Sequence, residues 1–191
     1  MLHKLFDGGL WLGVSFLIEP YAPLLLILLY LSIFLHQRFT YQTLLTPIIA
    51  FCSPVFLYFT YYFWYDNLEK FWLLFDWDFY PDLSFYSHEK YLFPILFISF
   101  FLIASIFLKS PKALAIKNKF RKNWILILTH LVITTAILLL VQDGSGSEFL
   151  YVLFPVSVIL ANGIEFFQKK WYADVIILLF LIVSFTMSAI A

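Results

Sequence analysis

The sequence predicts an all-α protein, a polytopic transmembrane helical bundle of about seven spans with a cytoplasmic N-terminus, and three observations lead to this fold class. Hydrophobic residues make up 63% of the 191 residues, whereas charged residues make up only 13%, about half their share in ordinary globular domains. Apolar stretches recur along the chain, each bounded by charge, Pro or Gly. Lys and Arg gather in alternate connections between these stretches. A lipid bilayer is therefore the expected solvent.

Seven apolar stretches are the expected spans. Five are long enough to cross a bilayer, but the first two fall short of the roughly 20 residues that a straight span needs. We interpret these two either as short spans or as a hairpin around a Glu19–Pro20 turn that lies below the membrane surface. The stretches cover residues 5–18, 21–35, 44–63, 91–108, 124–141, 149–167 and 171–190.

Lys and Arg predict the orientation, because cytoplasmic loops retain these residues. With the N-terminus inside, only Lys70 and Lys90 fall outside. An odd number of spans then places the C-terminus on the extracytoplasmic side. The inner residues are Lys4, Arg38, Lys109, Lys112, Lys117, Lys119, Arg121, Lys122, Lys169 and Lys170.

Residues 1–191 are expected to form a single integral-membrane domain with two longer connections. Residues 109–123 form a basic cytoplasmic loop, which we interpret as a topology determinant that contacts anionic lipid. Residues 64–90 form an extracytoplasmic aromatic loop.

The outer loop contains a predicted interfacial helix. Asp66 and Glu69 have the spacing of a capping box at a helix N-terminus. Apolar side chains then recur at a helical period, which predicts an amphipathic helix lying on the membrane. These side chains are Leu68, Phe71, Trp72 and Phe75.

Gly9 and Gly13 form a GxxxG motif in the first stretch. Small residues at this spacing let two helix backbones approach closely. We expect the pair to serve helix packing within the chain, with a dimer interface as the alternative.

Glu19 is the leading candidate for a polar site. It precedes Pro20 between two short helices, and a carboxylate partly withdrawn from water can act as an acid, a base or a cation ligand. The structural alternative is a solvated side chain at a helix end.

The outer loop supplies further candidates for this site. Carboxylates and a histidine stand among Trp and Tyr residues, a combination that suits a sugar or a cationic headgroup. The alternative is that they solvate a loop whose aromatic side chains rest on the membrane. The candidates are Asp76, Asp78, Asp82, His88 and Glu89.

Three polar residues lie within predicted spans. His130 and Thr134 are four residues apart and share a helix face in the fifth stretch, and Asn162 lies in the sixth. Hydrogen bonds to neighbouring helices or backbone carbonyls explain these residues without any chemistry.

No metal site is expected, and the sequence leaves any cofactor unknown. A membrane non-haem iron carotenoid oxygenase would need several histidines at one metal, but the predicted topology separates His3 and His36 from His88 and His130. A single cysteine, Cys52, excludes an intrachain disulfide. The zero net charge gives no reason to expect nucleic acid as a partner.

Two stretches carry a resemblance to known proteins. Residues 7–26 (DGGLWLGVSFLIEPYAPLLL) and 149–165 (FLYVLFPVSVILANGIE) resemble an uncharacterised family of multi-pass inner-membrane proteins, a domain of unknown function found mainly in Bacteroidetes. The resemblance covers nearly the whole chain and matches the C-terminal part of a longer family member. It implies that the chain is a fragment lacking N-terminal spans.

The first stretch is also similar, more distantly, to polytopic lipid-linked-sugar glycosyltransferases. These enzymes share a glycine-containing helix, a polar-Pro turn and a leucine-rich helix. Their acidic catalytic residue lies upstream of this pattern, and a basic residue commonly precedes Pro where this chain has Glu19. The resemblance therefore assigns no catalytic residue here.

The sequence favours a multi-pass protein of the bacterial inner membrane that is by itself not an enzyme and whose molecular activity stays open. Its expected partner is the lipid bilayer. One alternative is a glycosyltransferase-like membrane module that handles a polyprenyl-linked sugar, and another is a transporter or a membrane-complex subunit.

Overall fold

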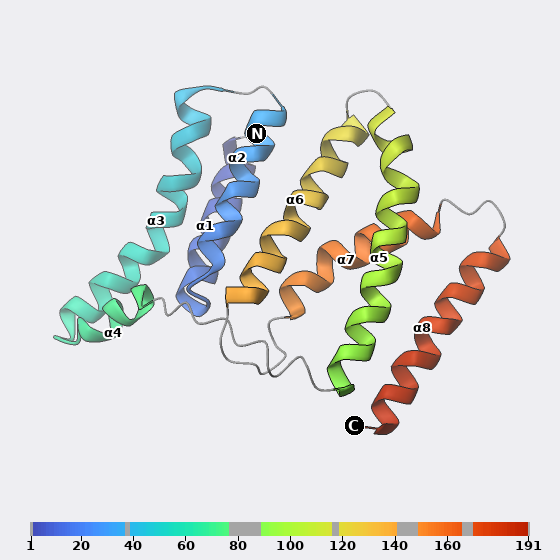
Figure 1. The fold of residues 1–191 in the computed structure, drawn as a ribbon. Coiled ribbons are helices and arrows are strands. Elements are labelled where there is room, and N and C mark those ends of the chain that lie inside the picture. The colour runs from blue at the N-terminus through green and yellow to red at the C-terminus, as the bar shows by residue number, and fades with distance from the viewer. Residues whose placement is uncertain are drawn as a thin grey trace. The chain divides into compact units, whose positions relative to one another are not determined.

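The computed structural model describes residues 2–36, 39–76, 89–115, 119–140, 149–165 and 170–190. Every regular element among these residues is helical (Figure 1), which confirms the predicted all-α class. The elements in chain order are α1 (Leu2–Ile18), η1 (Ala22–Leu25), α2 (Leu26–Leu35), α3 (Tyr41–Trp64), α4 (Glu69–Trp72), η2 (Leu73–Phe75), α5 (Glu89–Ala115), α6 (Lys119–Leu140), α7 (Phe149–Ile164) and α8 (Lys170–Ile190).

Three helices in the described part of the chain are long and apolar enough to cross a membrane. They are Tyr41–Trp64, Leu92–Ala115 and Phe120–Leu140. The sixth and seventh predicted spans contain α7 (Phe149–Ile164) and α8 (Lys170–Ile190), whose searched apolar parts cover Phe149–Ile164 and Trp171–Thr186. The 17 residues of α1 correspond to roughly 26 Å of helix, slightly less than a bilayer core.

The chain divides into two compact units, which are described separately. The first unit contains Met1–Tyr80 and Val132–Val141, and the second contains Pro81–Leu131 and Gln142–Ala191.

In the first unit, α1 packs along α3. Gly9 lies against Pro47 and Gly13 lies against Pro54, so the two helices run in the same direction. The chain returns between them through η1 and α2, and α2 is tied to α3 where the Tyr30 hydroxyl donates a 3.0 Å hydrogen bond to the carbonyl oxygen of Leu44.

A capping box fixes the start of α3. The Thr40 hydroxyl accepts a 3.2 Å hydrogen bond from the Thr43 N–H, and the Thr43 hydroxyl accepts a 3.0 Å hydrogen bond from the Thr40 N–H. These bonds satisfy two backbone donors that a helix start otherwise leaves unpaired. Sequence analysis did not identify this pair.

The end of α3 corrects the capping box that the sequence predicts at Asp66. Asp66 adopts the left-handed conformation, with φ of 53°. Its N–H donates to Phe63, and the Asn67 N–H donates to Tyr62, which is the Schellman pattern of a helix C-terminus. Asp66 therefore ends α3, and Leu68, without a side-chain cap, precedes α4.

The predicted interfacial helix consists of α4 followed by η2. Its Phe71 and Leu74 are buried with Phe16 of α1, whereas Trp72 and Phe75 are exposed. Two of the four apolar side chains predicted for one face are therefore exposed, and the buried face of the element packs on α1 and α3.

In the second unit, α5 and α6 form a hairpin. Its core contains Ala113 and Trp124 together with Ile159 of α7. The indole N–H of Trp124 donates a 3.1 Å hydrogen bond to the Ser110 hydroxyl, which joins the two arms of the hairpin. Most of the basic segment 109–123 therefore belongs to helix ends, because α5 extends to Ala115 and α6 starts at Lys119.

Candidate functional site

The C-terminal parts of α1 and α3 hold an aromatic cluster built around three buried residues. Phe16, Phe71 and Leu74 form its centre, and partly buried side chains of α1 and α3 pack around them. The rings of Phe16 and Phe75 lie 5.6 Å apart, edge to face, a favourable arrangement for aromatic pairs. The surrounding residues are Leu17, Phe51, Val55, Tyr58, Phe59 and Tyr62.

Glu19 lies one turn beyond Phe16, where α1 ends. Its N–H donates a 2.8 Å hydrogen bond to the Ser15 carbonyl oxygen, and its own carbonyl oxygen accepts a 3.1 Å bond from the Ala22 N–H. Pro20 has no N–H to continue the helix, so the chain turns into η1. The half-buried Glu19 side chain is therefore held near the aromatic cluster by a fixed backbone turn.

The outer-loop candidates lie largely outside the described residues. Asp76 is exposed and follows η2 directly. Asp78, Asp82 and His88 lie outside the described residues, and so does the side chain of Glu89. A sugar or headgroup site that includes these residues stays a prediction. Among the described residues, no three His, Cys, Asp or Glu side chains are grouped so that they could hold a metal ion.

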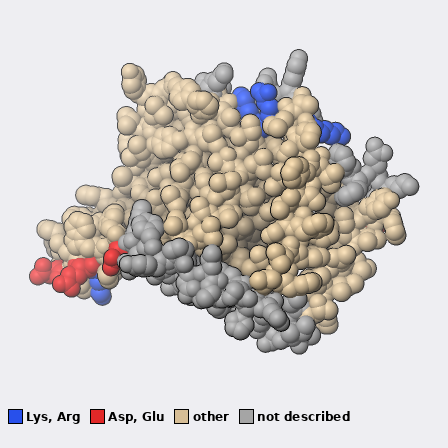
Figure 2. Space-filling model, viewed as in Figure 1, with Lys and Arg blue, Asp and Glu red and all other residues tan. Residues whose placement is uncertain are grey.

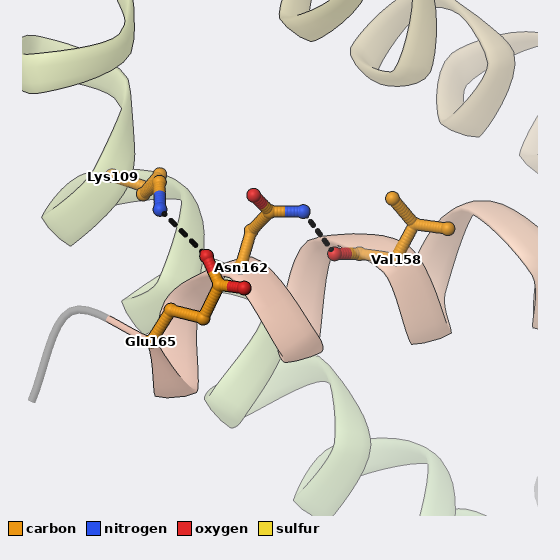
Figure 3. Close-up of polar contacts among 4 residues, drawn as sticks. All are labelled: Lys109, Val158, Asn162 and Glu165. Carbon is orange, nitrogen blue, oxygen red and sulfur yellow. Dashed lines mark hydrogen bonds and ion pairs between the residues drawn. The ribbon is translucent and has the colours of Figure 1, made fainter.

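The three polar residues of the predicted spans, His130, Thr134 and Asn162, have different surroundings. The ring of His130 is half-buried, 5.5 Å from the ring of Phe154, and Thr134 is buried. The Asn162 side chain donates a 2.8 Å hydrogen bond to the carbonyl oxygen of Val158 in its own helix (Figure 3). This bond lies within α7 and runs to a backbone carbonyl.

Gly9 and Gly13 lie at the closest approach of α1 and α3. A Cβ added to Gly9 would lie 2.5 Å from the carbonyl oxygen of Pro47, and one added to Gly13 would lie 2.6 Å from Pro54 Cγ. Real side chains essentially never come so close. The two glycines therefore take part in packing within the chain.

A second close helix contact, in the other unit, was missed in the sequence. Gly163 of α7 packs directly on Ser105 of α5, and a Cβ on Gly163 would lie 3.0 Å from Ser105 Cα. The available signal was the pair of small residues Ala104 and Ser105 within the otherwise bulky segment 100–108.

An ion pair lies beside this contact (Figure 3). Lys109 Nζ of α5 is 3.4 Å from Glu165 Oε2 at the end of α7. The Lys109 side chain is only 14% exposed, whereas that of Glu165 is 73% exposed. Lys109 also lies over the ring of Phe120, 5.7 Å from its centre, so α5, α6 and α7 meet around one cation.

An apolar pocket opens next to the same contact. Its volume is about 90 Å³, and its lining comes from α5, α7 and α8. Ser105 is the one lining residue with a polar side chain. The lining residues are Phe100, Phe101, Ala104, Ser105, Leu108, Leu160, Gly163, Ile164, Ile176 and Phe180.

Comparison with known proteins identifies a family but no activity. No curated protein and no solved structure shows significant similarity to the chain. A family model described as "Family of unknown function (DUF6427)" matches residues 2–190. Since this match covers nearly the whole sequence, the chain belongs to the DUF6427 family of unknown function.

Proposed function

We propose that this protein is a multi-pass component of the bacterial inner membrane, with about seven spans and a cytoplasmic N-terminus. One observation carries the proposal: three long apolar helices leave most of their surface uncovered by the protein itself. At most 22% of the apolar window of each is buried inside the protein, and for Leu92–Ala115 the share is 6%. Apolar surface on this scale needs lipid or apolar partner helices to cover it.

Charges at the helix ends support the proposed orientation. In the second unit, Lys109, Lys112, Arg121 and Lys122 lie where α5 runs into α6, and Figure 2 shows basic side chains gathered at this end of the hairpin. In the first unit, acidic residues lie where α3 runs into α4 (Figure 2). The positive-inside rule places the basic hairpin end in the cytoplasm.

Reporter fusions test this topology. Alkaline phosphatase, which is active only outside the cytoplasm, should be active after Asp76 and at the C-terminus. Green fluorescent protein should fluoresce when it is inserted after residue 117. A cytoplasmic result for either outer fusion, or an outer position for residue 117, contradicts the proposed topology.

A second candidate function is a module that positions a polyprenyl-linked sugar. The observation that favours it is the place of Glu19, a half-buried carboxylate one turn beyond Phe16 in the aromatic cluster. Carboxylates bind sugar hydroxyls, and aromatic rings provide flat apolar surfaces for sugar rings and prenyl chains.

Photo-crosslinking in membrane vesicles tests this second function. A photoactivatable polyprenyl-phosphate sugar should label the native protein, and Glu19→Gln should reduce the labelling. Asp174→Asn is the matched control, since Asp174 is an exposed acid of α8. Equal labelling of the Glu19→Gln variant and the native protein would exclude a role for the Glu19 carboxylate.

A further inference from the structure

We propose that the pocket between α5, α7 and α8 binds one anionic phospholipid of the surrounding bilayer, with an acyl chain in the pocket and the phosphate at Lys112. This inference rests on the proposed position of the protein in a membrane. It concerns residues of the second unit alone.

The lining of the pocket selects hydrocarbon. Nine of its ten lining residues carry no polar side-chain atom, and the side chain of the tenth, Ser105, is itself buried. Such a lining offers a sugar almost no hydrogen-bond partner, whereas hydrocarbon needs none. The pocket, of about 90 Å³, takes a segment of one acyl chain.

Helical geometry brings a positive charge to the end of this pocket. Phe101, Ser105 and Leu108 line it at intervals of four and three residues along α5, so they share one helix face. Lys112 follows Leu108 by four residues on that face and is exposed. Four residues correspond to about 6 Å along the helix. This length is similar to the distance between the first carbons of an acyl chain and the phosphate of the same lipid.

The charges around Lys112 favour an anionic lipid over a zwitterionic one. Lys109 and Glu165 offset each other as an ion pair. Lys112 adds a positive charge on α5, and Arg121 and Lys122 add two more at the start of α6. The net positive charge at this hairpin end complements a headgroup that carries a full negative charge.

The ion pair has a definite role in this arrangement. Glu165 follows Ile164, the last lining residue of α7, so its carboxylate lies near the proposed phosphate and repels it. Lys109 holds that carboxylate at 3.4 Å and so limits the repulsion. Removing the negative charge of Glu165 should therefore strengthen lipid binding, whereas removing the charge of Lys112 should weaken it.

Native mass spectrometry of the full chain in mild detergent tests the site. Phosphatidylglycerol and phosphatidylcholine with identical acyl chains should be titrated separately. We expect one phosphatidylglycerol to bind more tightly than phosphatidylcholine. Lys112→Gln should weaken phosphatidylglycerol binding about fivefold, the effect of one basic residue near a membrane surface, and leave phosphatidylcholine binding unchanged.

Two further variants separate the headgroup from the chain. Glu165→Gln should tighten phosphatidylglycerol binding, and a larger side chain in Ala104→Leu should fill the pocket and weaken the binding of both lipids. Lys4→Gln, which removes an exposed charge from α1, is the matched control and should leave both affinities unchanged.

Several results would overturn the lipid site. One is equal affinity for the two lipids, and another is an equal effect of Lys4→Gln and Lys112→Gln on phosphatidylglycerol affinity. Weaker phosphatidylglycerol binding by Glu165→Gln, or unchanged lipid binding by Ala104→Leu, would have the same consequence. Displacement of the lipid by glycerol phosphate, which has no acyl chains, would also overturn it. Failure of the membrane proposal would appear separately, as a protein that alkaline carbonate extracts from membranes.

Discussion

Replacing Gly13 by alanine places a methyl group at the closest approach of α1 and α3. An ideal Cβ at this position would lie 2.6 Å from Pro54 Cγ and closer still to the carbonyl oxygen of Phe51. Neither atom can swing away as the end of a flexible side chain can, because one belongs to a proline ring and the other to the helix backbone. Relief therefore requires the two helices to move apart.

The net effect follows from two opposing terms. Alanine is intrinsically favoured over glycine within a helix by about 1 kcal/mol. Overpacking of a tight contact costs about 1–3 kcal/mol, and more where backbone must move. Because backbone is involved at Gly13, we expect Gly13→Ala to lower the free energy of unfolding by about 1–2 kcal/mol.

Unfolding of the full chain in mixed micelles of increasing dodecyl sulfate content provides the assay, with fluorescence from the 6 Trp residues as the signal. Gly8→Ala is the matched control in the same helix. A Cβ at Gly8 would meet only the mobile end of Leu29, at 3.1 Å from Cδ2. We expect this control to unfold within about 0.5 kcal/mol of the native protein or to be slightly more stable.

The comparison of the two alanine variants decides the outcome. If Gly13→Ala is as stable as Gly8→Ala, the methyl group meets no obstacle at residue 13. Parallel packing of α1 against Phe51 and Pro54 would then be refuted, whatever the absolute stability of either variant.

Three other predictions concern contacts outside this interface. Gly163→Leu should destabilise the protein by about 1–3 kcal/mol through overpacking against Ser105, and Ser105→Gly in the same chain should recover part of that loss. If the stability changes of the two substitutions simply add in the double mutant, the contact is contradicted. Thr40→Ala should lower the free energy of unfolding by about 1 kcal/mol, because it removes the cap of α3. Amide hydrogen exchange in the first turn of α3 should become faster, and unchanged exchange would contradict the capping box. Trp124→Phe and Ser110→Ala should each cost about 0.5–1.5 kcal/mol for one lost hydrogen bond, and the double mutant should cost less than their sum in the same unfolding assay.

The hydropathy pattern alone was enough to predict the long helices. An apolar segment suited to lipid must form the hydrogen bonds of its backbone N–H and C=O groups within itself, as a helix does. Each of the seven apolar stretches contains a helix. Their ends were predicted less well, as α5 and α6 show by extending into the basic segment. Charged side chains do not by themselves stop a helix, so the edge of an apolar stretch does not mark the end of the helix.

Candidate contacts were predictable only in part. The GxxxG motif pointed to the face of α1 that packs, but not to Pro47 and Pro54 as its neighbours, since nothing in an apolar stretch encodes which other stretch it meets. Asp66 was assigned to the wrong helix end because an acidic residue suits a helix start, whereas its left-handed backbone ends α3. The pairing of Lys109 with Glu165 joins residues 56 positions apart, beyond the reach of local spacing.

The parallel pairing of α1 and α3 has a consequence for biosynthesis. The glycine face of α1 has no partner in α3 until residues 47–54 have been made, about 40 residues later. At ordinary translation speeds this delay is about 2–8 s. During that time α1 and α2 have been made, but the backbone surface at Gly9 and Gly13 still lacks its partner in α3. The glycine face of α1 is therefore covered only when α3 arrives, and a ribosome that stalls before this point leaves that face without its partner.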